Sequence, residues 1–143
     1  MSNPTPKTAV PIIGVESVEE IRRFYIGSLG FEHVRGVIGQ DGRFEICALA
    51  MDGARLMFAR TQGTGPSAKT AVTKQPVTIY IEVADVDRYF SLLGKKHGVN
   101  VTERVATQWW GVRSFKVMDP HGYEIWFYQV VGEPKPPAGT KLV

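Results

Sequence analysis

The stretch Val15–Phe31 reads VESVEEIRRFYIGSLGF, and a second stretch, Val83–Val99, reads VADVDRYFSLLGKKHGV. Each has a valine, a helix-capping residue, an apolar helical pattern and a glycine, and equivalent positions stand 68 residues apart. Near the end of each half the spacing becomes 69, where Leu56–Phe58 matches Ile125–Phe127. Because solenoid repeats have periods of about 20–50 residues, this longer repeat predicts two complete supersecondary units.

Each unit is predicted to contain a strand, a helix and three further strands. In the first unit Ser17 is the predicted N-cap and Gly30 the helix stop; in the second, Asp85 and Gly98 have these roles. The predicted helices are 18–29 and 86–97, and the predicted strands are 9–15, 31–37, 44–51, 55–60, 77–83, 99–105, 111–118 and 123–130.

This order predicts an α+β fold in which two tandem βαβββ modules form a cup-shaped mixed sheet with the helices on its outer face. The predicted organisation is an N-terminal tail (1–8), a first module (9–60), a linker (61–76), a second module (77–131) and a C-terminal tail (132–143). The linker is rich in Gly, Ser, Thr and Lys, and the last tail is rich in Pro and Gly, so we expect that tail to be extended or mobile.

The composition is that of a globular domain, with 43% hydrophobic and 22% charged residues in 143. There is no apolar run near 18 residues, and the first residues have no apolar signal core, so no membrane partner is expected. The single cysteine, Cys47, interpreted as half-buried on a strand, fits a cytoplasmic location. The net charge is +3, but no basic run is interleaved with aromatic residues, so no nucleic-acid partner is expected.

Strand alternation divides the predicted sheets into two faces. One face is purely apolar and should form the core under the helices: Leu56, Phe58, Ile79, Ile81, Val83, Ile125 and Phe127. The other mixes aromatic and polar side chains, as a ligand site does. Its predicted ligand-binding residues, together with two tryptophans before the strand 111–118, are Arg55, Met57, Thr78, Tyr80, Glu82, Trp109, Trp110, Glu124, Trp126 and Tyr128. The alternative is that this face touches solvent or another subunit.

The adjacent residues Trp109 and Trp110 cannot both point to one side of a strand. Trp110 shares the parity of Ser114, opposite to Phe115, so it is predicted to face the cup, with Trp109 at the rim. For Trp109, an ordinary interface or core position is an equal alternative. Ligands that are flat and conjugated stack on aromatic side chains of this kind.

The segments Val15–Phe31, Val83–Asp87 and Phe115–Tyr123, the last containing Asp-Pro-His-Gly, carry a family resemblance. Over about residues 9–130 the chain resembles the glyoxalase/bleomycin resistance protein/extradiol dioxygenase group, the vicinal oxygen chelate superfamily. The resemblance implies paired βαβββ modules that form a cup and, often, a homodimer.

The same resemblance implies that metal enzymes of the group place a histidine near the start of each first strand and a carboxylate on each last strand. In this chain Val10 and Thr78 occupy the histidine positions, and Met57 and Trp126 occupy the carboxylate positions. None suits a divalent cation. His33, His97 and His121 lie on different predicted elements, so we predict no metal site and no cofactor.

Three functions are compatible with these features. The first is a metal-free binding protein, similar to the bleomycin-resistance branch, that sequesters a flat aromatic compound. There, Tyr80, Trp110, Trp126 and Tyr128 would stack on the compound, and Arg55, Glu82 and Glu124 would orient it. The partners expected for this function are a small-molecule ligand and a second copy of the chain.

The second function is a lyase, isomerase or dioxygenase-like enzyme that uses Glu82 or Glu124 as a catalytic general base, or a non-standard metal site. In such an enzyme Arg55 or Arg113 would hold a carboxylate or an oxyanion. The third is an accessory protein that acts through dimerisation and whose cup has no ligand.

Overall fold

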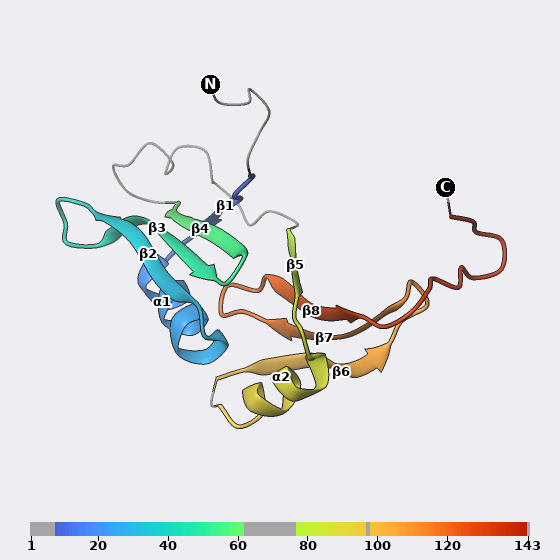
Figure 1. The fold of residues 1–143 in the computed structure, drawn as a ribbon. Coiled ribbons are helices and arrows are strands. Elements are labelled where there is room, and N and C mark those ends of the chain that lie inside the picture. The colour runs from blue at the N-terminus through green and yellow to red at the C-terminus, as the bar shows by residue number, and fades with distance from the viewer. Residues whose placement is uncertain (1–7, 62–76, 97, 143) are drawn as a thin grey trace, which may run out of the picture. The chain divides into compact units, whose positions relative to one another are not determined.

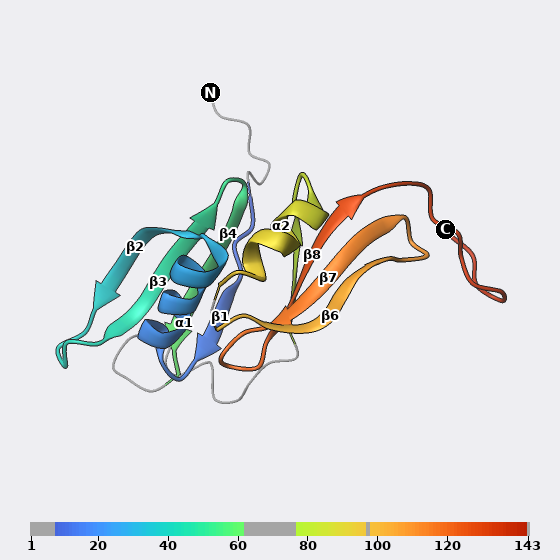
Figure 2. The same cartoon turned by 90° about the horizontal axis from the view of Figure 1, so that it is seen from below.

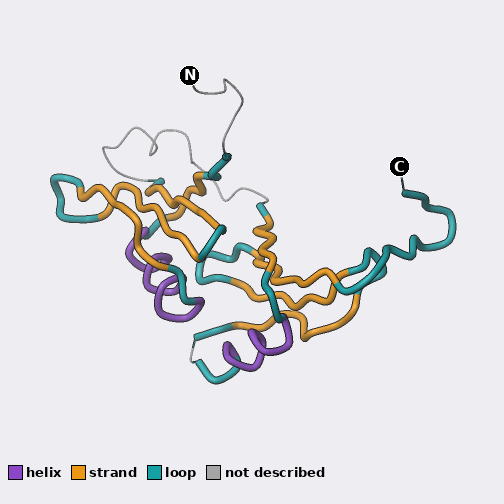
Figure 3. Tube along the Cα trace, in the orientation of Figure 1, coloured by secondary structure: helices purple, strands orange, loops and turns teal. Residues whose placement is uncertain are grey.

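The computed structural model describes residues 8–61, 77–96 and 98–142. The chain divides into two compact units, Met1–Gln75 and Pro76–Val143. Each unit contains one four-stranded mixed sheet and one helical segment (Figures 1 and 3), which confirms the α+β class and the two βαβββ modules. Apart from Thr61, the predicted linker lies outside the described residues, and the joining of the sheets into a cup stays a prediction.

The first unit begins with a short strand and a helix and ends with three antiparallel strands. Its sheet has the order β1-β4-β3-β2, with β1 parallel to β4 and the other pairs antiparallel (Figure 2). The elements are β1 (Ile12–Val15), α1 (Val18–Phe24), the π-helical turn η1 (Tyr25–Leu29), β2 (Glu32–Ile38), β3 (Phe44–Met51) and β4 (Ala54–Arg60).

The second unit repeats this arrangement with the sheet order β5-β8-β7-β6, where β5 is parallel to β8. The elements are β5 (Thr78–Glu82), α2 (Val86–Leu93), β6 (Asn100–Thr107), β7 (Val112–Met118) and β8 (Glu124–Val130). The repeat extends to strand register, because Ile12 pairs with Met57 and Tyr80 pairs with Trp126. The two sequence offsets, 68 and 69, are therefore those of the paired first and last strands.

Both predicted helix starts are confirmed by side-chain caps. The backbone N–H of Glu20 donates to Ser17 Oγ at 3.1 Å, and that of Arg88 donates to Asp85 Oδ1 at 3.1 Å. Such caps satisfy N–H groups that have no partner within the helix. The first helical segment ends at Gly30, whose φ of 91° lies in the left-handed region.

The predicted end of the second helix at Gly98 is wrong. The structure ends α2 at Leu93, with Gly94 as the C-cap. Glycine inside a helix costs about 1 kcal/mol relative to alanine, so Gly94 favours an early end. Within the rest of the predicted helix, His97 lies outside the described residues.

The helix-facing row of each sheet forms its core, as the alternation predicts. In the second unit Ile79, Ile81, Ile125 and Phe127 are buried, whereas Val83, just after β5, is only half-buried. In the first unit Leu56 and Phe58 are buried. Tyr25 of η1 lies edge-on to Phe31 and tilted against Phe58, with ring centroids 5.4 and 4.8 Å apart. In the described parts of the chain no helix is long and apolar enough to cross a membrane.

Cys47 of β3 is fully buried rather than half-buried, and burial raises the pKa of its thiol to about 11 from the usual 9.0. We expect no reaction of the native protein with the thiol reagent DTNB at pH 8, because the thiolate is the nucleophile. Protein unfolded in guanidinium is the control and should react fully. Because the folded pKa exceeds the unfolded value, the free energy of unfolding should fall as pH rises from about 9 to 11. Rapid stoichiometric labelling without denaturant would contradict the assignment.

Candidate functional site

One face of the second sheet carries a cluster of aromatic rings. Tyr89 and Phe90 of α2 contact Phe115 and Phe127, so the helix covers the face to which these two phenylalanines point. Alternation places the neighbouring side chains on the opposite face. We define the aromatic face as the four rings that meet there: Tyr80 of β5, Trp110 of the β6–β7 turn, and Trp126 and Tyr128 of β8.

The four rings form a connected network. Tyr80 and Tyr128 are stacked, with centroids 4.0 Å apart and planes 12° from parallel. Trp110 donates its Nε1–H to the Tyr80 hydroxyl oxygen at 3.0 Å, and its ring meets Trp126 edge-to-face at 6.3 Å. Tyr80 is 47% exposed, so the network presents aromatic surface instead of burying it.

Lys116 of β7 adds a positive charge to this face. Its Nζ lies 4.6 Å from the centre of the Trp126 ring, 3.4 Å from Glu103 Oε2 and 3.5 Å from Glu124 Oε1. A cation in this position is attracted to the negative face of the indole. The sequence interpretation missed Lys116, although its parity with Ser114 on the strand 111–118 is a signal that identifies it.

The Tyr128 hydroxyl remains a neutral group near neutral pH. Burial, followed by the negative charge of Glu82, raises the pKa of Tyr128 above its usual value. Glu82 is the cross-strand partner of Tyr128 and is exposed. This end of the face therefore offers a carboxylate acceptor beside a phenol, which can donate or accept a hydrogen bond.

Trp109 and Trp110 lie in a tight turn, just before β7. The N–H of Gly111 donates to the Gln108 carbonyl at 3.2 Å, and the N–H of Gln108 donates to the Val112 carbonyl at 2.7 Å. With Gly111 at a φ of 91°, this is a three-residue hairpin loop ending in a left-handed glycine. Trp109 is 46% exposed and edge-on to Trp110 at 5.5 Å.

The other predicted residues are distributed over both units. Thr78 is exposed and pairs in register with Glu124, whose side chain is 41% exposed. Arg55 and Met57 belong to β4 of the first unit, where Arg55 is exposed and Met57 is half-buried beside Ile12. The structure thus brings Tyr80, Glu82, Trp110, Trp126 and Tyr128 together on one sheet, and their roles in binding stay predictions.

Arg113, considered above as a group that holds a ligand carboxylate, is paired with a residue of α2. Its Nε lies 2.9 Å from Asp87 Oδ2 of α2, and the hydrogen bonds of this pair hold the pKa of Asp87 below its usual value. Arg113 has the parity of Phe115, so it points to the helix-covered side of the sheet, away from the aromatic face.

The four positions that correspond to metal ligands in the related enzymes lie at equivalent places in the two units. Val10 precedes Ile12 by two residues, as Thr78 precedes Tyr80, and Ile12 and Tyr80 are the register partners of Met57 and Trp126. Across residues 8–61, 77–96 and 98–142, no three His, Cys, Asp or Glu side chains gather as a metal site would require.

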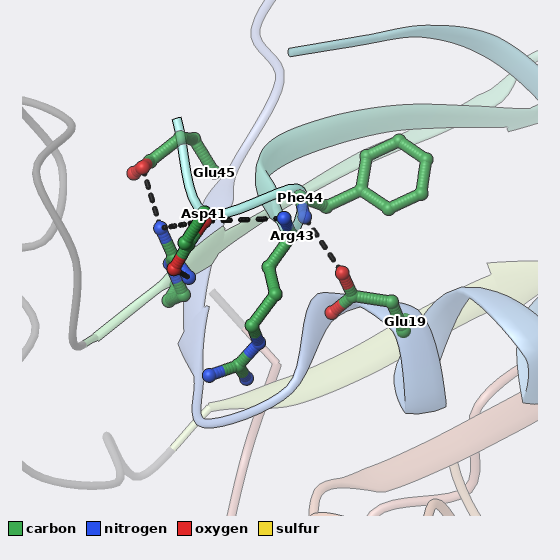
Figure 4. Close-up of polar contacts among 6 residues, drawn as sticks. Glu19, Asp41, Arg43, Phe44 and Glu45 are labelled. Atoms are coloured by element: carbon green, nitrogen blue, oxygen red, sulfur yellow. Dashed lines mark hydrogen bonds and ion pairs between the residues drawn. The ribbon is translucent and has the colours of Figure 1, made fainter. Parts of the chain in front are cut away.

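A second polar cluster lies in the first unit, at the end of the core-facing row of β4 (Figure 4). Arg60 is 2% exposed; its Nη1 lies 2.7 Å from Asp41 Oδ2, and its Nη2 contacts Glu45 Oε1. The hydrogen bond from Arg60 lowers the pKa of Asp41 and raises that of the guanidinium. Glu19 of α1 accepts from the backbone N–H of Phe44 at 2.6 Å. Because Asp41 and Glu45 are both held by Arg60, this cluster fixes the β2–β3 turn to β4.

Comparison with protein families gives a match over most of the chain. A family model described as "Glyoxalase/Bleomycin resistance protein/Dioxygenase superfamily" matches residues 8–127. The uncharacterized protein Rv0887c of Mycobacterium tuberculosis is 28% identical over 117 residues, which are 79% of this chain and 68% of that protein. The uncharacterized protein Mb0911c of Mycobacterium bovis is also 28% identical, with 79% of this chain and 76% of that protein covered.

Among solved structures, TioX from Micromonospora sp. ML1 has a TM-score of 0.73 and 19% identity, covering 88% of this chain and all of that chain. TnmS3, an antibiotic binding protein from Streptomyces sp. CB03234, has a TM-score of 0.68 and 22% identity, covering 90% of this chain and 99% of that chain. These likenesses show a common fold.

Proposed function

The chain belongs to the Glyoxalase/Bleomycin resistance protein/Dioxygenase superfamily, and we propose that it binds a small, flat aromatic or conjugated compound on its aromatic face without transforming it. The observation that carries the proposal is the network of Tyr80, Trp110, Trp126 and Tyr128 on the side of the sheet opposite α2. A sheet face that only meets solvent has no need of four adjoining aromatic rings. Here the rings adjoin, and Tyr80 is nearly half exposed, as is expected of a binding surface.

Polar groups around the rings supply orientation. Glu82 lies beside Tyr128, and Lys116 is held over Trp126 between Glu103 and Glu124. A site with an apolar aromatic wall and a few polar groups at its edge is typical of small-molecule binding. The likeness in fold to TnmS3, an antibiotic binding protein, supports a sequestering role of this kind.

The test is a titration with three planar dyes: proflavine, which is cationic, lumichrome, which is neutral, and anthraquinone-2-sulfonate, which is anionic. The chain has three tryptophans, and Trp109, Trp110 and Trp126 all lie on or beside the aromatic face. Intrinsic fluorescence therefore reports on this region. We expect saturable quenching by at least one dye, with N-acetyltryptophanamide as the control for inner-filter effects. Quenching that matches this control for all three dyes would refute the proposal.

The same titration distinguishes binding from turnover. After prolonged incubation the dye should be recovered unchanged by chromatography. Neither of the two carboxylates considered as general bases is enclosed in an apolar site, which is the environment that makes a carboxylate a stronger base. Glu82 is exposed, and the Glu124 side chain is 41% exposed and paired with Lys116. A chemically altered compound would instead favour the enzyme alternative.

We predict that the purified protein holds no stoichiometric divalent metal and that chelation leaves dye binding unchanged. The reason is the chemistry of Val10, Met57, Thr78 and Trp126, which supply no imidazole or carboxylate at the four ligand positions. Elemental analysis of protein purified without chelators is the measurement. One Zn, Ni, Fe or Mn ion per chain would contradict the prediction.

We also predict a homodimer. Besides the family resemblance, the edge strand β2 exposes Val34, Val37 and Ile38, each more than half accessible. Apolar side chains on an edge strand favour association with another chain. Light scattering at micromolar concentration should give twice the chain mass of 15.9 kDa. A monomer mass over the whole concentration range would exclude the dimer.

A further inference from the structure

The chain after β8 is hydrogen-bonded to the turn that carries two of the tryptophans. The backbone N–H groups of Val131 and Gly132 donate to the Gly111 carbonyl at 2.9 and 3.2 Å, and the N–H of Lys135 donates to the Trp109 carbonyl at 2.6 Å. We call residues 131–137 the C-terminal strap. In Figure 1 it leaves β8 and passes beside the β6–β7 turn.

In the last part of the strap, only one residue has a backbone N–H that can donate to the Trp109 carbonyl. Residues 134–137 read Pro-Lys-Pro-Pro, and proline has no backbone N–H, so Lys135 is the one donor in this run. That donor is the one bonded to Trp109. The flanking prolines restrict φ and stiffen the segment, which lowers the entropy lost when it is held in place.

The turn is shaped to receive the strap. Gly111 has a φ of 91°, and a Cβ at this position would stand 2.5 Å from the Gly132 carbonyl oxygen and 3.2 Å from the Glu133 carbonyl carbon. A side chain there would be strained by its backbone conformation and would also push the strap away. Glycine is therefore required both by the hairpin loop and by the close approach of the strap.

We infer that the C-terminal strap positions the aromatic face: it holds the Trp109–Gly111 turn so that Trp110 stays against Tyr80 and Trp126. Without it, Trp110 would sit at the tip of a hairpin, a place where chains are mobile. The strap lies beyond residue 127, where the family match ends. The effect on ligand affinity rests on the proposed function, but the effect on the tryptophans does not.

The test compares Lys135→Pro with Lys135→Ala in the full-length chain. Lys135→Pro removes the N–H donor while it extends the proline run, and Lys135→Ala removes the charge but keeps the donor. Acrylamide quenching of intrinsic fluorescence should rise for Lys135→Pro and stay at the wild-type value for Lys135→Ala. Loss of one hydrogen bond corresponds to about a two- to tenfold change in an equilibrium, so dye affinity should fall by about that factor for Lys135→Pro only.

A double-mutant cycle separates positioning through Trp110 from a general loss of stability. In a Trp110→Phe background, which cannot bond Tyr80, Lys135→Pro should not weaken dye binding further. Gly111→Ala, if it folds by circular dichroism, should reproduce the quenching change of Lys135→Pro. Equal quenching of the two Lys135 variants, or an undiminished effect of Lys135→Pro on dye affinity in the Trp110→Phe background, would overturn the inference. If the wild-type protein binds no dye, the proposed function fails, and the quenching comparison still decides whether the strap holds the turn.

Discussion

Replacing Phe127 with alanine is expected to lower the free energy of unfolding by about 3–5 kcal/mol, because truncating a buried phenylalanine removes apolar contacts and leaves a cavity. Phe127 of β8 is fully buried. Its ring stacks on Phe115 at 5.2 Å and meets Tyr89 of α2 edge-on at 4.8 Å. The alanine variant removes one of the two phenylalanine rings of the sheet, Phe115 and Phe127, that contact α2. Urea denaturation followed by circular dichroism measures the loss.

Trp126→Ala is the matched control, since Trp126 is the preceding residue and points to the opposite face. It is half-buried, so its truncation should cost less stability than Phe127→Ala although the side chain is larger. If Trp126→Ala unfolds the protein while Phe127→Ala is mild, the assignment of the two faces is inverted, and the aromatic face is then not a ligand site.

The second large effect concerns binding. Trp126→Ala should weaken dye binding by about 1–3 kcal/mol, the scale of losing one aromatic stacking partner. The variant also removes the ring under the Lys116 ammonium, whose Nζ lies 4.6 Å from its centre, and the edge-to-face contact with Trp110. Isothermal titration calorimetry is the suitable measurement, because the substitution removes one of the fluorescent reporters.

Trp126→Phe provides the control for this prediction. It keeps an aromatic surface at the same position and should recover most of the affinity that alanine loses. Wild-type affinity in the Trp126→Ala variant would mean that the dye binds elsewhere. An equal loss in both variants would mean that the indole N–H or its size matters more than stacking.

Much of this fold follows from local sequence signals. The repeat of Val15–Phe31 in Val83–Val99 predicts two βαβββ units, and the caps Ser17 and Asp85 are found where the sequence places them. Strand alternation separates Phe127 from Trp126 correctly, because side-chain direction in a strand has a fixed period of two. These signals depend only on residues that are close in the sequence, so they can be recognised without a structure.

Other features depend on contacts between distant residues. The early end of α2 at Gly94 and the burial of Arg60 with Asp41 and Glu45 were not predicted. A charged residue at the end of an apolar row is normally placed in solvent. Here Asp41 of the β2–β3 turn and Glu45 of β3 supply the carboxylates that make burial of Arg60 favourable. The placement of Lys116, like that of Arg60, depends on carboxylates from other parts of the chain. Glu103 and Glu124, on the two neighbouring strands, hold it over Trp126.

Local signals in the sequence predict the two modules, the division of their strands into two faces, and the aromatic residues on the face of the second sheet opposite α2. How those residues meet depends on contacts that form only in the folded chain. The bond from Trp110 to Tyr80 joins positions 30 residues apart, and Lys135 reaches the carbonyl of Trp109 from the far end of the chain. Local periodicity states which side of a strand a residue occupies, but hydrogen bonds between a turn and remote segments form only after the sheet has brought them together.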